Sequence, residues 1–191
     1  THENDTIRGR INFSEGERKY YVCRLYIDST RTIMHFIPED IKGYVVTGIA
    51  TFVSRPITVL ENRGYAFAEV LVSGRMKLLA VKDRLFIEKK LVWQLVKWRT
   101  PVTKDSDKSI PLTKDFKTVL ANEMFDYPDA PAMIEHSDTT ASKMKKLIIG
   151  YNKYVGELDY VAKKRWFLFE AGASLAGSMV ALSNNNPAAF G

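Results

Sequence analysis

Apolar and polar residues alternate along the first half of the chain, up to residue 98. Stretches such as DTIRGRINF, KYYVCRLYID and FAEVLV have this two-residue period, and short polar connections such as SG and KD separate the later ones. A period of two places alternate side chains on opposite faces of a strand. Strands that follow one another closely with tight turns are typical of antiparallel sheets. The pattern therefore predicts an antiparallel β domain over residues 1–98, folded as a meander, a sandwich or a small barrel.

The hydrophobic period changes after residue 98. Residues 99–111, RTPVTKDSDKSIP, form a polar segment with a proline near each end, which we interpret as a linker. Three segments that follow have apolar residues at helical spacing: TKDFKTVLANEMF, DAPAMIEH and ASKMKKLIIGYNKYVG. Asp129 is expected to cap the second of these helices, and Gly156 to end the third. The sequence predicts about three helices over residues 112–158 that pack on the β domain, which makes the fold class α+β.

The end of the chain, residues 163–191, differs in pattern from everything before it. The basic step KKR precedes WFLFEAGASLAGSMVAL, whose odd positions are apolar or glycine while its even positions include Glu170 and two serines. This alternation is typical of an outer-membrane β-barrel strand, so the segment is predicted to start a transmembrane barrel. The residues expected at the membrane interface are Lys163, Lys164, Arg165, Trp166 and Phe167, and those expected to face lipid are Phe169, Ala171, Ala173, Leu175 and Met179.

A helix is the alternative interpretation of this segment, because AGASLAG also offers small residues at helical spacing. Two features favour the strand. Glu170 lies inside the apolar run, and the run is only marginally long enough to span a bilayer as a helix. A lone strand would leave backbone groups unpaired in lipid. If the strand interpretation holds, the other strands of the barrel are expected in sequence that follows residue 191.

Charge and cysteine content remove several function classes. The net charge is +6, but basic and acidic residues are interleaved, as in KDRLFIEKK, so nucleic acid is not an expected partner. Cys23 is the single cysteine, which excludes a disulfide within the chain, and its apolar setting YYVCRLYI indicates a buried thiol. The chain opens within a strand pattern without Met, so we expect a mature or trimmed product, and missing targeting information says little about the compartment.

Several motifs in order resemble those of an uncharacterised group of Bacteroidota cell-envelope proteins. They are NDTIRGRI, FIPEDIKGY, FAEVLVSGRMKLL followed by LFIEKK, and the helical DAP and LIIGYNKYV, which together cover residues 4–156. The resemblance implies a β-rich domain with a helical end, often followed by an outer-membrane barrel, and it implies no catalytic residues. At Asp129-Ala130-Pro131 the chain lacks a cysteine that is common in the group. A domain that precedes the first strand of such a barrel is expected to be periplasmic.

Residues that could carry chemistry are few. His2, His35 and His136 lie far apart in the sequence, and no metal-binding, phosphate-loop or nucleophile motif is present, so no catalytic residue, cofactor or metal is expected. The acidic residues Glu123, Asp126 and Asp129 could hold a cation such as calcium, but capping and turn formation are the favoured explanation.

Exposed aromatic residues are the remaining candidates for binding. Trp93, Trp98 and Tyr65 could form a platform for a partner or a sugar, although two tryptophans five residues apart point to opposite faces of a regular strand. The expected function is therefore a non-enzymatic periplasmic domain of an outer-membrane β-barrel protein. It would contact membrane lipid and other envelope proteins as an interaction module. The alternative is a glycan-binding module.

Overall fold

The computed structural model describes residues 6–13, 17–59, 62–82, 84–90, 92–97, 116–137, 140–162 and 176–183. Contacts between residues divide the chain into two units. Unit 1 comprises residues 1–69 and 163–191, and unit 2 comprises residues 70–162. One long strand, β6 (Asn62–Gly74), contributes its first part to unit 1 and its last part to unit 2.

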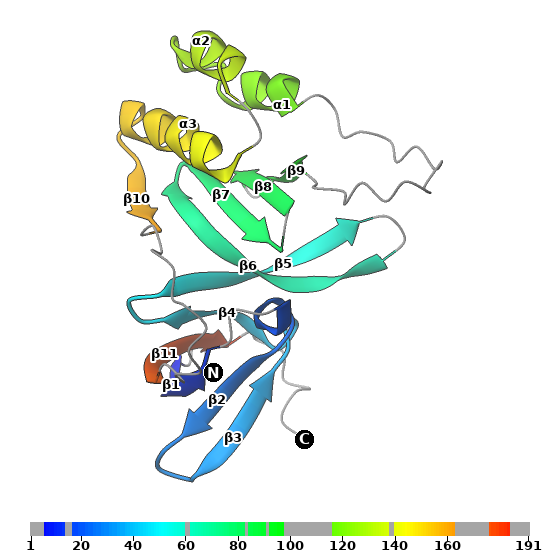
Figure 1. The fold of residues 1–191 in the computed structure, drawn as a ribbon, viewed down its shortest axis with the longest axis vertical. Helices are drawn as coiled ribbons and strands as arrows, with labels where there is room; N and C mark the ends of the chain where they lie inside the picture. Colours follow the sequence, from blue (N-terminus) through cyan, green and yellow to red (C-terminus); the bar gives the residue numbers. More distant parts are fainter. Residues whose placement is uncertain are drawn as a thin grey trace. The chain divides into compact units, whose positions relative to one another are not determined.

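Unit 1 is an antiparallel sheet (Figure 1). The strands follow the order β3-β2-β1-β11-β4-β5-β6. Their bounds are β1 Thr6–Asn12, β2 Cys23–Ile27, β3 Thr32–Phe36, β4 Ile41–Val46, β5 Ala50–Val59 and β11 Ala176–Ser183, and a short 3-10 helix, η1 (Glu17–Tyr20), connects β1 to β2. The alternating pattern of the sequence is thus realised as strands that pair with their sequence neighbours, with β11 as the exception.

The last described strand, β11, lies between β1 and β4. Its register runs from Thr6 opposite Leu182 to Asn12 opposite Ala176, and on the other side Met179 lies opposite Val46. The strand prediction for this part of the tail is therefore confirmed. β1 and β4 of the same chain pair with the two edges of β11, and the barrel interpretation of the tail stays a prediction.

Stacked aromatic rings form the centre of unit 1. The ring of Tyr44 stacks on Phe52 with centroids 4.5 Å apart and meets Phe67 edge-on at 5.0 Å. The three side chains are buried, as are Leu25 on β2 and Val46 on β4. Rings of this size remove a large apolar area from water, which makes the cluster a main source of stability for the unit.

Unit 2 combines an antiparallel sheet with three helices. The sheet has the order β6-β7-β8-β9, and β10 also pairs with β6. The bounds are β7 Met76–Val81, β8 Arg84–Lys89, β9 Val92–Lys97, β10 Leu158–Val161, α1 Phe116–Glu123, α2 Ala130–Glu135 and α3 Ala141–Tyr154. A continuous apolar core includes Leu78, Ile87, Leu120 and Ile148 from both the strands and the helices.

The predicted class, α+β with an antiparallel sheet and three helices, is confirmed by the elements described. The expected domains, residues 1–98 and 112–158, do not coincide with the two units, because β7 and β8 share a core with the helices. The predicted linker, residues 99–111, lies outside the described residues. Among the helices that are described, none combines the length and apolar character needed to cross a bilayer.

Helix ends follow the predictions only in part. Asp129 occupies the N-cap position of α2, but its side chain makes no capping hydrogen bond. Thr140 caps α3 instead by accepting a bond from the Lys143 amide. Gly156 follows the C-cap of α3 with a φ of 73°, a left-handed conformation in which glycine is favoured, as the sequence predicted.

Candidate functional site

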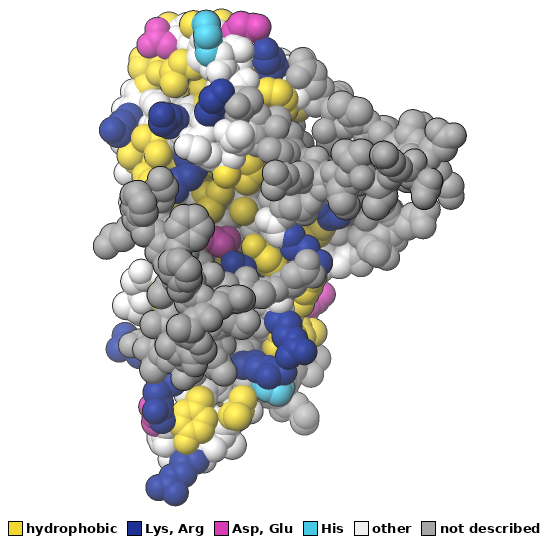
Figure 2. All heavy atoms as spheres, viewed as in Figure 1, with side chains coloured by type: hydrophobic (Ala, Val, Ile, Leu, Met, Phe, Trp, Pro, Cys, Tyr) yellow, Lys and Arg dark blue, Asp and Glu magenta, His cyan; other side chains and the backbone are white. Residues whose placement is uncertain are grey.

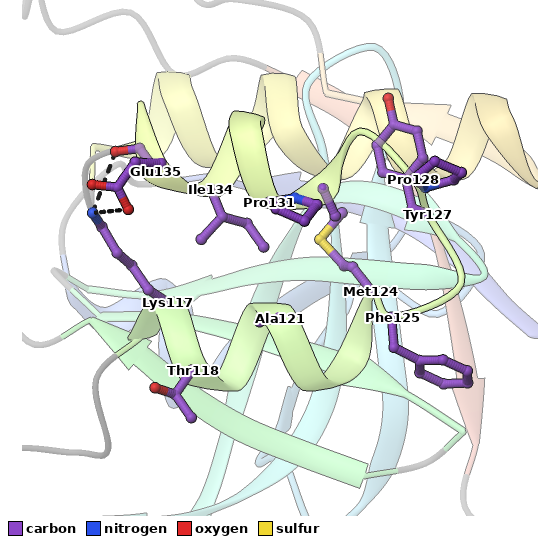
Figure 3. A pocket seen from close by; sticks show the side chains of 11 residues that line it. Lys117, Thr118, Ala121, Met124, Phe125, Tyr127, Pro128, Pro131, Ile134 and Glu135 are labelled. Atoms are coloured by element: carbon purple, nitrogen blue, oxygen red, sulfur yellow. Dashed lines mark hydrogen bonds and ion pairs between the residues drawn. The ribbon is translucent and has the colours of Figure 1, made fainter.

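An apolar groove between α1 and α2 is the candidate site of unit 2 (Figure 3). Its volume is about 600 Å³. It is lined by Lys117, Thr118 and Ala121 of α1, by Met124, Phe125, Tyr127 and Pro128 of the connection, and by Ala130, Pro131, Ile134 and Glu135 of α2. The groove therefore combines the facing sides of two short helices with the turn that joins them.

The turn between α1 and α2 sets the spacing of the groove walls. Amide hydrogen bonds from Met124 to Leu120, from Tyr127 to Met124 and from Ala130 to Tyr127 carry the chain from one helix to the next. The Tyr127 ring packs against the rings of Tyr151 and Tyr154, with centroid distances of 6.1 and 4.9 Å. The walls are thus held by the core of unit 2.

The floor and the rim of the groove differ in character. Met124, Ala130 and Ile134 form a buried apolar floor. At the rim, Phe125 exposes 83% of its surface and, in Figure 3, points away from the helices. At the opposite end Lys117 and Glu135 form an ion pair at 3.2 Å, drawn with dashed lines in Figure 3. An apolar floor with a polar end is the composition of a protein interaction site.

A buried charge network supports the turn. The Lys89 ammonium is almost completely buried, donates to the carbonyl of Glu123 and lies 3.7 Å from the Asp126 carboxylate. It also lies over the rings of Tyr151 and Phe125, at 4.9 and 5.7 Å from the centroids. A buried cation needs such partners because desolvation alone would be costly. Lys89 therefore holds the backbone at the end of α1 and contacts the Phe125 ring at the rim of the groove.

Asp126 links this network to the ends of β6 and α3. Its carboxylate accepts a hydrogen bond from the Tyr151 hydroxyl at 3.2 Å and lies 3.7 Å from the guanidinium of Arg75. Arg75 donates to Glu157 at 3.0 Å, and this bond is the main reason that the pKa of Arg75 is raised. Asp126 thus forms ion pairs from its position in the turn that follows α1, which is consistent with the predicted role in turn formation.

The described residues hold few groups suited to bond-making chemistry. Cys23 is buried in unit 1, and burial raises the pKa of its thiol to about 12. His35 lies exposed on β3, while the His136 ring bonds the carbonyl of Ala132 at the end of α2. Within the described ranges no three His, Cys, Asp or Glu side chains are grouped so that they could hold a metal. What the groove offers is a binding surface.

The residues predicted from the sequence are only partly described. Tyr65 lies on β6 opposite Pro56 and is 48% exposed, in unit 1. Trp93 lies on β9 opposite Glu88, in unit 2. Met179 lies on β11 opposite Gly9 and Val46. Trp98 and the predicted membrane residues from Lys163 to Leu175 lie outside the described residues. The structure does not assign Tyr65 and Trp93 to a common unit.

Sequence reasoning missed the groove. Its signal was present in EMFDYPDAP, where Phe125 follows directly after the buried Met124, Pro128 lies between the helices and Pro131 lies in the first turn of α2. A large aromatic residue beside a turn, off the apolar face of its helix, is consistent with an exposed position.

Comparison with known proteins gives no relative from which a function could be transferred. No family model, no curated protein and no solved structure matches the chain. The function must therefore be argued from the site.

Proposed function

We propose that this chain is a non-enzymatic interaction module of the bacterial cell envelope, which binds an apolar segment of a partner protein in the groove between α1 and α2. The exposure of Phe125 beside that groove is the observation that carries the proposal. Apart from its contact with Lys89, the Phe125 ring exposes 83% of its surface, and covering it would remove a large apolar area from water.

The groove fits one or two large side chains of a partner. Its volume of about 600 Å³ lies within the usual range of binding pockets. The buried floor made of Met124, Ala130 and Ile134 can receive an apolar anchor, while Phe125 packs against its flank. The Lys117–Glu135 pair at the end can take polar groups that follow the anchor. Short helices and extended peptides use such anchors in apolar grooves.

A photo-crosslinking experiment tests the site in the native envelope. A photoreactive phenylalanine analogue replaces Phe125 in the full-length protein, and the same analogue replaces Val92 as the control. Val92 is an exposed apolar residue of unit 2 that does not line the groove. We expect one discrete protein adduct from position 125 and none from position 92. The partner is then identified by mass spectrometry.

A blocking variant tests the same groove without the probe at Phe125. Ala121 lines the groove, and its neighbour Asn122 is exposed on α1 but does not line it. Ala121→Arg should weaken binding of the identified partner by about 30-fold, which corresponds to about 2 kcal/mol. Asn122→Arg changes the charge equally and should leave binding unchanged. Equal affinities of the two variants would reject the groove as the binding site.

The location in the envelope is the second part of the proposal. It rests on the resemblance of residues 4–156 and on the alternation within residues 163–191, proposed as the start of an outer-membrane β-barrel with the preceding domain in the periplasm. Ala176–Ser183 pairs with β1 and β4, so a barrel that uses these residues would require them to leave that sheet. Fractionation of the full-length product should recover it with outer-membrane proteins; complete recovery without detergent would contradict this location.

A further inference from the structure

A second pocket lies in unit 1, beside the short helix η1. Its volume is about 370 Å³. It is lined by Ile11 and Phe13 at the end of β1, by Arg18 and Lys19 of η1, by Val22 and Arg24 at the start of β2, and by Tyr44 of β4. From this pocket we infer a binding site for a phosphate group carried by a small organic molecule or by a lipid headgroup. The inference does not depend on the groove of unit 2.

The charged residues among those described in the lining of the pocket are all cationic. Among its described lining residues, Arg18, Lys19 and Arg24 are cationic and no Asp or Glu is present. Lys19 lies 3.7 Å from Glu69, with both side chains largely buried, so part of its charge is balanced. The side chains of Arg18 and Arg24 have no ion-pair partner within the described part of the chain. The two arginines therefore supply the charge available to a ligand.

The pocket is built on elements that the core of unit 1 holds in place. The buried Tyr44 hydroxyl donates to the carbonyl of Lys19 at 2.7 Å, which ties η1 to β4. The amides of Tyr21 and Val22 both bond the carbonyl of Arg18, at 3.0 and 2.9 Å. The Phe13 ring packs against the ring of Phe52, with 6.0 Å between the two centroids. The backbone that carries Arg18 is therefore positioned before any ligand binds, which lowers the entropic cost of binding.

Arginines at a small pocket suit a phosphate group. A guanidinium presents a planar fork that matches two phosphate oxygens, and such charge-assisted bonds are the strong ones. The apolar walls Ile11, Phe13 and Val22 can contact the organic part of the ligand. The volume is near the lower end for ligand pockets, which suits a headgroup-sized molecule. On the face shown in Figure 2, Lys and Arg side chains are spread over the strands of unit 1 and would attract anions generally.

The test separates the pocket from this general attraction. In the full chain, the pocket variant Arg18→Gln/Arg24→Gln is compared with the control variant Arg8→Gln/Arg31→Gln. Arg8 and Arg31 are exposed in unit 1 and do not line the pocket, so both variants lose the same charge. Calorimetric titration with inorganic phosphate should show saturable binding that the pocket variant weakens by about tenfold or more, while the control variant retains it.

Vesicle flotation distinguishes the two sources of phosphate. If the natural ligand is a lipid headgroup, the unchanged protein and the control variant should float with phosphatidylglycerol vesicles, whereas the pocket variant should not. Equal flotation of both variants, together with the loss in the phosphate titration, would assign the pocket to a soluble phosphate compound. Absence of saturable binding of either probe, or equal weakening in both variants, would overturn the inference. Neither double variant should change crosslinking at Phe125. A negative result for the phosphate site would therefore leave the proposed groove of unit 2 untouched.

Discussion

Asn152 is a buried polar residue that fixes the end of α3 against the sheet of unit 2. Its side chain is fully buried, donates to the carbonyl of Met76 at 2.8 Å and accepts from the amide of Met76 at 2.9 Å. A Cβ at Gly74 would lie 2.6 Å from the Asn152 amide nitrogen and 2.2 Å from the carbonyl of Glu157. Glycine at position 74 is thus what allows the helix end and the strand to approach this closely.

Replacing Asn152 by alanine should destabilise unit 2 strongly. The Met76 amide and carbonyl would lose their side-chain partner in a buried site, at a cost of about 1–3 kcal/mol for each group left unpaired. Lys153→Ala at the neighbouring, exposed position of α3 is the control and should change stability little. Urea denaturation of both variants measures the difference. Equal midpoints would show that the Asn152 bonds do not contribute.

Cys23 should be a slow-reacting thiol in the folded protein. The folded pKa of about 12, raised by burial, leaves on the order of one thiol in a thousand ionised at pH 9. Because the unfolded thiol ionises at lower pH, its ionisation favours unfolding, and this contribution destabilises unit 1 as the pH rises from the unfolded pKa toward about 12. Labelling with iodoacetamide at pH 9 should be slow without denaturant and rapid in urea. Rapid labelling of the folded chain would contradict the burial of this strand.

The contact between β1 and β2 depends on a glycine. A Cβ at Gly9 would lie 2.3 Å from the carbonyl oxygen of Tyr26 and 2.8 Å from a side-chain carbon of Leu25. Both distances are too short for a real contact, so β1 could accommodate a larger residue only by moving away from β2. Gly64, on β6 of the same unit, has no neighbour within 4 Å of such a Cβ.

Gly9→Ala should therefore weaken unit 1, whereas Gly64→Ala should not. A clash of this kind with backbone typically costs about 1–3 kcal/mol, comparable to overpacking in a core. The rate of Cys23 labelling in low urea reports the opening of unit 1, because Cys23 lies on β2. We expect faster labelling in Gly9→Ala only. If both variants labelled at the rate of the unchanged chain, β1 would tolerate the methyl group and the proposed contact would be wrong.

Local elements were predictable from the sequence because their signals are local. The alternation in TIRGRIN and CRLYI predicts strands, and the spacing of Met144, Leu147, Ile148 and Tyr151 predicts α3. Pairing between distant segments has no such signal. The parity of the tail predicted a strand that ends at Leu182, and Ala176–Ser183 is the part that the structure describes as one, but nothing in its residues specified β1 and β4 as neighbours.

The candidate groove was less predictable than the elements that form it. The floor residues Met124, Ala130 and Ile134 belong to apolar patterns that also describe ordinary core positions. Residues 124–129 connect α1 to α2, and this end of α1 and the turn after it contact Lys89 and Tyr151, which are distant in sequence. The rim residue Phe125 becomes recognisable as exposed only once this turn is known.

Unit 1 is formed by segments from both ends of the chain. Residues 1–69 form most of the unit, all of unit 2 follows, and β11 then enters the first sheet. In the described strand order, β11 is the strand that joins β3-β2-β1 to β4-β5-β6. Closure over so many residues makes this pairing a late step of folding, since the entropy of a long loop must be lost before the contacts form.

A chain that ends at Ala162 should lose the order of unit 1 while unit 2 remains folded. Without β11, the facing edges of β1 and β4 would lose their backbone partners. The core of unit 2, which lies within residues 70–162, contains no residue of the removed segment. Iodoacetamide should therefore label Cys23 rapidly in the truncated chain, and hydrogen exchange should still protect the amides of α3. A chain that ends at Ser183 keeps β11 and is the control; slow labelling in both chains would show that β1 and β4 do not need this strand.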